Sequence, residues 1–116
     1  MYDHIELKVK NLGKAAEFYG AALKPLGAKL CYDDVAMKGF GAKAPALYLA
    51  KGAGKGIHLA FTAPSRAAVD GFHEEGLKAG GKDNGAPGIR ADYAPTYYAA
   101  FLIDPDGNNV EAVCLK

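Results

Sequence analysis

The sequence predicts an α+β fold made of two β-α-β-β-β modules, which together form a curved mixed β-sheet with the helices on its outer face. The first observation is an internal repeat, because a shift of 54 positions aligns His4 with His58 and Leu23 with Leu77. The second is that strand, helix and helix-stop signals follow in the same order in both halves. Internal duplication sets the whole architecture, so it decides the fold class.

The bulk composition suits one compact domain, since the chain has 116 residues and half of them are hydrophobic. We expect one domain over 1–116, with a first module of about 1–53 and a second of about 54–116. A net charge of +1 without a dense basic run indicates neither a nucleic-acid nor a membrane partner. A secretion signal is not evident, so we expect a cytoplasmic protein in which Cys31 and Cys114 stay reduced.

The first module opens with HIELKVK, in which polar and apolar residues alternate as in a half-buried strand. Asn11 can cap the helix that follows, and Pro25 with Gly27 should end it. Three short strands are then expected, at about 28–33, 35–40 and 46–50.

The second module repeats this order with IHLAFTA at 57–63 as its first strand. Ser65 can cap a helix that runs through about Lys78 and ends at Gly80-Gly81. Its apolar face is expected to turn inward through Val69, Phe72 and Gly76. Two strands, at 97–103 and 109–115, should close the chain.

The segment KDNGAPGIRADYAPT, at 82–96, is predicted as a long loop because it is rich in Gly, Pro, Asn and Asp. Loops of this length contact substrate or are mobile insertions. Arg90 has forked donors that suit a substrate carboxylate or phosphate, the alternative being a plain surface role. Tyr93, Tyr97 and Tyr98 are expected to line the same pocket, although core packing is an equal alternative for one of the last two.

His4, His58 and Glu111 form the candidate metal site. The two histidines occupy equivalent repeat positions on strand faces opposite their helices, and Glu111 lies on the last strand. Two imidazoles and a carboxylate suit Fe(II), Mn(II), Zn or Ni and leave positions open for substrate. The alternative is that both histidines are structural and that Glu111 is a solvated charge. Glu6 shares the face of His4 and is a candidate general base, a partner that orients His4, or a solvated charge.

Three stretches carry a resemblance to a known family: the opening HIELKVKNLGKAAEFYGAALKPLG, the second opening HLAF and the closing AFLIDPDGNNVEA. They resemble the glyoxalase / bleomycin-resistance / dioxygenase family, also called the vicinal oxygen chelate superfamily. In that superfamily the metal ligands come from the first and last strands of each repeat. The resemblance therefore implies the positions His4, Tyr48, His58 and Glu111.

Tyr48 departs from the family pattern, because glyoxalase I and methylmalonyl-CoA epimerase relatives have Glu or Gln there. A neutral phenol, with a pKa near 10, is a poor ligand for Zn or Ni at pH 7. Tyr48 therefore disfavours true glyoxalase I activity and is kept only as a candidate catalytic residue. The remaining His-His-Glu set is more similar to extradiol dioxygenases and fosfomycin-resistance thiol transferases, although the latter have threonine at the position of Glu6.

The resemblance implies a homodimeric small-molecule enzyme that binds a divalent metal and a substrate with neighbouring oxygens. Lyase, isomerase, dioxygenase and thiol transferase chemistry all remain open, as does the identity of the metal. In similar proteins the modules that build one cavity often come from different chains. The rival hypothesis is a metal-free protein of the bleomycin-resistance type, which sequesters a small molecule and in which His4 and His58 are ordinary pocket residues.

Overall fold

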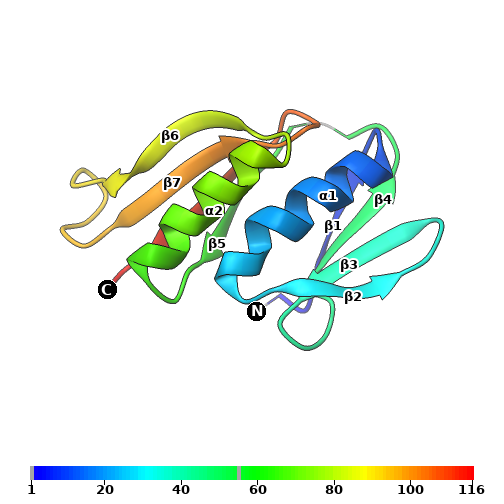
Figure 1. Cartoon of the computed structure of the whole chain (residues 1–116), viewed down its shortest axis with the longest axis horizontal. Coiled ribbons are helices and arrows are strands. Elements are labelled where there is room, and N and C mark those ends of the chain that lie inside the picture. The colour runs from blue at the N-terminus through cyan, green and yellow to red at the C-terminus, as the bar shows by residue number, and fades with distance from the viewer. Residues whose placement is uncertain (1, 55) are drawn as a thin grey trace.

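Two four-stranded mixed sheets and two α-helices form the protein in a computed structural model that describes residues 2–54 and 56–116 (Figure 1). The first sheet has the order β1 (Ile5–Val9), β4 (Leu47–Lys51), β3 (Met37–Gly41) and β2 (Lys29–Asp33). The second has the order β5 (His58–Thr62), β8 (Asn109–Cys114), β7 (Tyr98–Ile103) and β6 (Lys82–Ile89). In each sheet the first and last strands of the module pair in parallel, and the other pairs are antiparallel. The predicted repeat and α+β class are confirmed, and the two sheets do not close into one.

Helix α1 (Leu12–Leu23) begins where the sequence predicts, because Oδ1 of Asn11 accepts a hydrogen bond of 2.9 Å from the Lys14 N–H. A short 3₁₀ turn, Lys24–Leu26, follows the helix. Gly27 then takes a positive φ of 92°, which glycine adopts without steric cost, and the chain turns into β2.

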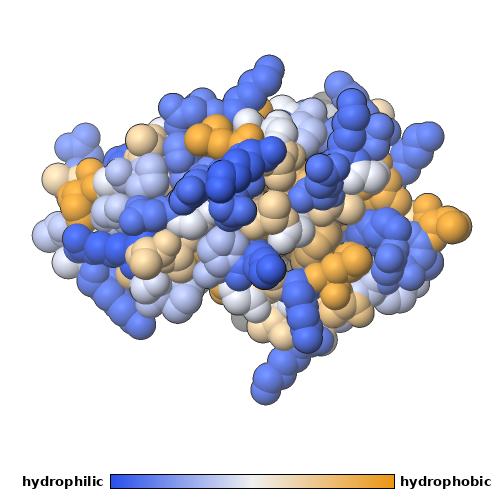
Figure 2. Space-filling view, in the orientation of Figure 1, coloured by the Kyte–Doolittle hydropathy of each residue, from blue (hydrophilic) through white to orange (hydrophobic). Residues whose placement is uncertain are grey.

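Helix α2 (Arg66–Lys78) is capped in the same way, with Oγ of Ser65 accepting from the Ala68 N–H at 3.1 Å. The two helices pack against each other and lie on the same side of the two sheets (Figure 1). Figure 2 shows this helix-bearing side as mostly hydrophilic, with an apolar group at the β2–β3 turn. Neither α1 nor α2, nor any other helix in the described part of the chain, is long and apolar enough to cross a membrane.

One hydrophobic cluster lies between the helices and the sheets and draws residues from both modules. Strand alternation explains how the sheets supply it: Leu7 and Val9 turn inward, whereas Glu6 and Lys8, which alternate with them along β1, stay exposed. The largest side chains that are fully buried in the cluster are Tyr19, Phe18, Phe40, Phe72, Leu49 and Leu102. The opposite face of each sheet is therefore the one available for a site.

Strand β6 corrects the prediction of a long loop over 82–96. Residues Lys82–Ile89 pair with β7, so only the segment between Ile89 and Tyr98 connects the two strands. The prediction was wrong because Gly and Pro usually mark loops. Here they occupy an edge strand, where Pro87 need not donate to a ladder and bulges at the glycines are tolerated.

Candidate functional site

Glu111 is the centre of the candidate site, on the face of the second sheet that the helices leave open. Its neighbours in β8, Val110 and Ala112, turn toward the core, so Glu111 points the other way. Even so, only 3% of Glu111 is exposed. A carboxylate buried to this degree is costly unless it is hydrogen-bonded or paired with a cation.

His58 supplies the first partner of this carboxylate. Its Nε2 lies 3.0 Å from Oε1 of Glu111, and half of the His58 side chain is exposed. Parallel pairing of β5 with β8 brings the two residues together, because Ala60, two residues after His58, is opposite Glu111 in the register. The structure therefore brings two of the candidate ligands, His58 and Glu111, into contact.

Tyr97 supplies the second partner, since its phenol O–H donates to Oε2 of Glu111 at 2.5 Å. This hydrogen bond, helped by partial burial, raises the pKa of Tyr97 to about 12. Tyr97 is therefore a protonated donor at neutral pH, and both oxygens of Glu111 are engaged. The sequence marked Tyr97 only as a pocket residue. The alternation that places positions 97, 99 and 101 on the face of Glu111 is the signal that would have indicated more.

These three side chains border a pocket of about 330 Å³. Its lining residues are His58, Tyr93, Tyr97, Phe101, Asn109 and Glu111. The Phe101 ring stacks on His58 with 6.3 Å between centroids, and Tyr93 packs edge-on against Tyr97 at 5.1 Å. The pocket thus combines an aromatic lining with one imidazole nitrogen and one carboxylate, which are donors suited to a borderline divalent cation.

Arg90 and Tyr98 lie on different sides of the second sheet. The Arg90 guanidinium carbon lies 5.3 Å from the centroid of Phe101, next to the pocket. Tyr98 faces α2 instead, because adjacent strand residues point to opposite faces. Its hydroxyl donates to Asp70 at 2.6 Å, and Arg66 lies over its ring. The structure therefore places Tyr93 and Tyr97 in the pocket lining and Arg90 beside the pocket, and it leaves Tyr98 outside.

His4 is not beside His58 and Glu111 within one chain. It borders a different pocket, of about 510 Å³, whose lining includes residues of α1, the 3₁₀ turn, the first sheet and β5. Its Nδ1 lies 2.6 Å from Asp3. Among residues 2–54 and 56–116 of one chain, groups of three or more His, Cys, Asp or Glu side chains placed to hold a metal are absent. The three predicted ligands do not converge in a single chain.

Tyr48 occupies the position in the first module that Glu111 occupies in the second. In the parallel β1–β4 pair Tyr48 is opposite Glu6, just as Glu111 is opposite Ala60 in the β5–β8 pair. The rings of His4 and Tyr48 meet edge-on at 5.4 Å. The repeat therefore places a His–Tyr pair on one sheet and a His–Glu pair on the other.

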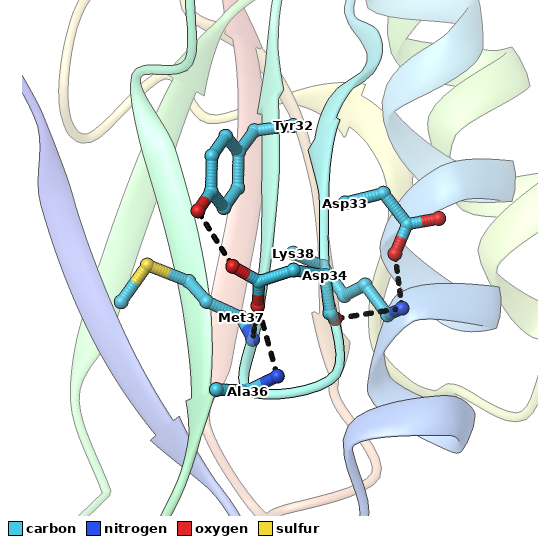
Figure 3. A network of polar contacts seen from close by, with 6 residues as sticks. All are labelled: Tyr32, Asp33, Asp34, Ala36, Met37 and Lys38. Carbon is cyan, nitrogen blue, oxygen red and sulfur yellow. Dashed lines mark hydrogen bonds and ion pairs between the residues drawn. The ribbon is translucent and has the colours of Figure 1, made fainter.

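Tyr32 extends the first pair across the sheet, a role that the sequence did not indicate. Its ring meets Tyr48 at 6.0 Å, and its hydroxyl donates to Asp34 at 2.6 Å. Figure 3 shows how the β2–β3 turn fixes Asp34, whose other oxygen accepts from the N–H groups of Ala36 and Met37 at 2.9 Å each. Lys38 closes the network through the Asp33 carboxylate and the Asp34 carbonyl.

Glu6 lies on the open face of the first sheet, near the row of rings formed by His4, Tyr48 and Tyr32. Its carboxylate is paired with the ammonium group of Lys8 at 2.9 Å, and 37% of its side chain is exposed. The pairing is intramolecular and near the surface, where ion pairs are weak and exchange readily. Glu6 therefore remains accessible for the roles that the sequence suggested.

Comparison with known proteins agrees with this architecture. The model of the Glyoxalase/Bleomycin resistance protein/Dioxygenase superfamily matches residues 2–112. A solved glyoxalase/bleomycin resistance protein from Albidiferax ferrireducens T118 is 28% identical, with a TM-score of 0.85 and 98% of each chain covered.

More distant structures share the fold. A glyoxalase-related enzyme from Fulvimarina pelagi is 17% identical, with a TM-score of 0.74 over 98% of this chain and 87% of the other. A genomically encoded fosfomycin resistance protein from Listeria monocytogenes is 21% identical, with a TM-score of 0.73 over 98% and 92%. A search of curated proteins returned no match. Because the family match spans nearly the whole sequence, the chain belongs to the Glyoxalase/Bleomycin resistance protein/Dioxygenase superfamily.

Proposed function

We propose that the protein is a homodimeric, metal-dependent enzyme of the vicinal oxygen chelate type, acting on a small molecule with neighbouring oxygens. His58 and Glu111 of one protomer and His4 of its partner would hold the divalent metal. The observation that carries the proposal is the nearly buried Glu111, held 3.0 Å from His58 at the edge of an aromatic pocket.

A second protomer would complete the donor set that one chain provides only in part. His4 and His58 are equivalent in the repeat, and their side chains are 52% and 50% exposed, respectively. Placing the open face of one protomer's first sheet against the open face of its partner's second sheet would bring these imidazoles toward each other. A neutral imidazole from each module and one carboxylate match the ligand chemistry of Fe(II), Mn(II), Zn and Ni.

The chain's own side chains would then divide the work at the pocket. When bound, the metal would act as a Lewis acid toward a substrate oxygen. Tyr97, which donates to Oε2, would fix the orientation of Glu111 and leave Oε1 directed toward His58. Glu6, carried with His4 on the first sheet, would be the proton acceptor. Tyr48 at the fourth position disfavours glyoxalase I chemistry, so lyase, isomerase, dioxygenase and thiol transferase reactions are the candidates.

Elemental mass spectrometry after reconstitution with Fe(II), Mn(II), Zn or Ni tests the metal set. We expect about one tightly held metal per chain, and loss of that metal in His4→Ala, His58→Ala and Glu111→Gln. His73→Gln is the matched control, because His73 is also a histidine near a carboxylate, Asp83, but lies on α2 outside the pocket. Wild-type protein that holds no more metal than Glu111→Gln would overturn the metal proposal.

Mixing two defective variants tests whether protomers share the site. His4→Ala keeps His58 and Glu111, whereas Glu111→Gln keeps His4. A mixed dimer would therefore contain one intact set, and co-refolding the two variants should restore part of the bound metal. Each variant refolded alone is the control. If the mixture binds no more than the average of its components, the ligands do not come from two protomers.

A metal-free ligand-binding protein is the second candidate, and the row of His4, Tyr48 and Tyr32 on the first sheet favours it. Such a row suits stacking against a flat molecule. In that case small aromatic ligands would bind equally well before and after treatment with a chelator. Tyr48→Ala would weaken their binding, and Glu111→Gln would leave it unchanged.

A further inference from the structure

Arg90 is held in a fixed position by backbone carbonyls of the strand that precedes it, β6. It follows the end of β6 and folds back, so that Nη1 donates to the Gly88 carbonyl at 3.0 Å and Nη2 donates to the Ala86 carbonyl at 2.8 Å. Both acceptors are neutral. In the part of the chain that the structure describes, the salt bridges do not include Arg90, so its charge has no carboxylate partner there.

Two glycines of β6 provide the space that the guanidinium occupies. A Cβ on Gly88 would lie 3.3 Å from Nη1, and a Cβ on Gly85 would lie 3.1 Å from Nη2 and 3.0 Å from Cδ1 of Phe101. Gly85 also has a φ of 152°, which side-chain-bearing residues rarely adopt. Both glycines lie where the register of β6 against β7 shifts. The strand thus departs from regular pairing at the positions where the guanidinium fits.

The guanidinium of Arg90 thus lies in a cradle, which we call the Arg90 cradle, formed by Gly85, Ala86, Gly88 and Phe101. Phe101 also borders the pocket of Glu111 and so connects the two. Arg90 lies over the Phe101 ring at 5.3 Å, and the same ring stacks on His58. In the β7–β8 pairing Phe101 is directly opposite Glu111. A half-buried positive charge is therefore fixed beside an aromatic-lined pocket and separated from the His58–Glu111 pair by one ring.

We infer that Arg90 binds an oxyanion, a carboxylate or a phosphate, at one end of the ligand that occupies this pocket. Two of its five N–H donors are used by backbone carbonyls, and the other donors remain for a charged acceptor. Anchoring the fork in advance lowers the entropy lost when an anion binds. The rings of Phe101, Tyr93 and Tyr97 suit an apolar or aromatic body attached to that anion. The inference takes its location from the proposed function but needs no metal.

Calorimetric titration of chelator-treated protein with benzoate, phenylphosphonate and neutral benzamide tests the inference. We expect both anions to bind more tightly than benzamide, and Arg90→Gln to weaken anion binding about tenfold or more. Arg90→Lys, which keeps the charge but loses the fork, should give an intermediate affinity. The stronger of the two anions identifies carboxylate or phosphate as the preferred group. Arg66→Gln is the matched control, because Arg66 also lies over a ring, that of Tyr98, but on the helix-covered face.

Gly88→Ala tests the cradle itself, since it keeps the charge of Arg90 and crowds Nη1. Its anion affinity should fall while its circular dichroism and unfolding midpoint confirm a folded protein. Anions that bind wild type no better than benzamide, or equally well to Arg90→Gln, would overturn the inference. So would an equal loss in Arg66→Gln. Anion binding in a protein that takes up no metal would sustain this inference and refute the metal proposal. Metal uptake without anion binding at Arg90 would sustain the metal proposal and refute this inference.

Discussion

Tyr19 and Asp104, which are 85 residues apart in the chain, form a buried hydrogen bond in which the phenol O–H donates to Oδ2 at 2.5 Å. Asp104 also accepts from Asn108 and from the N–H of Asp106, so the carboxylate is fully engaged within the turn before β8. Burial, followed by the charge of Asp104, raises the pKa of Tyr19. The bond joins α1 of the first module to the second module.

Tyr19→Phe should destabilise the protein by about 1–3 kcal/mol, because it leaves a buried carboxylate short of one donor. The measurement is the free energy of unfolding from urea denaturation. Tyr98→Phe is the matched control, since its hydroxyl also donates to a carboxylate, that of Asp70, but at an exposed site. Its cost should stay within about 0.5 kcal/mol. Equal losses in the two variants would contradict a special role for the bond between the modules.

The Tyr97 phenol should titrate near pH 12, because its hydrogen bond to Glu111 favours the protonated form. The resonance of ¹³C-labelled tyrosine, assigned with Tyr97→Phe, measures this. Since the pKa is higher in the folded state, the stabilisation is complete below about pH 10 and is lost as the pH rises toward 12. Glu111→Gln should shift the titration downward. An unchanged titration would show that Glu111 is not the cause.

The carboxylate of Asp83 should contribute to the free energy of unfolding at neutral pH, and this contribution should disappear in acid. His73 lies 2.8 Å from its carboxylate, and this hydrogen bond, followed by one from the Gly85 N–H, lowers the pKa of Asp83. A lowered pKa in the folded state means that the contribution is present above about pH 4 and lost as the pH falls through the folded value. Asp83→Asn should flatten the acid limb of the unfolding free energy against pH. Asp92→Asn, which removes a carboxylate in the β6–β7 connection instead, is the matched control.

Gly39→Ala should destabilise the first sheet by about 1–3 kcal/mol and displace its tyrosine rings. A Cβ there would lie 2.9 Å from Cβ of Pro45 and 3.0 Å from both Cβ of Tyr32 and Cε1 of Tyr48. Gly20→Ala is the control for which we expect the opposite sign. Gly20 lies within α1, and a Cβ there would make only an ordinary contact of 3.7 Å with Phe40. That change should stabilise by about 0.5–1 kcal/mol. Thermal unfolding of both variants measures the contrast.

Local chemistry made most of the fold predictable. Asn11 and Ser65 cap the two helices as expected, and Gly27 ends the first one, because caps depend only on neighbouring backbone groups. The sequence did not predict strand β6, because the reason for its glycines lies in tertiary structure. Gly85 and Gly88 make room for Arg90, which no local pattern reveals.

The candidate site was predictable to the extent that strand register determines it. Alternation indicated the strand face that His58 and Glu111 each occupy, and the parallel pairing of β5 with β8 brings the two residues together. The hydrogen bond from Tyr97 depends on how the segment before β7 approaches β8, and the sequence did not indicate it. The meeting of His4 with this pair stays a prediction, because it depends on how two protomers associate.

Because the strand registers of the two modules match, one substitution would place the same pair of side chains on both sheets. Tyr48 stands opposite Glu6 as Glu111 stands opposite Ala60. Tyr48→Glu would therefore give each half of the duplicated scaffold the same histidine and carboxylate. The two modules therefore share one frame, in which the side chain that meets the histidine is a phenol on the first sheet and a carboxylate on the second.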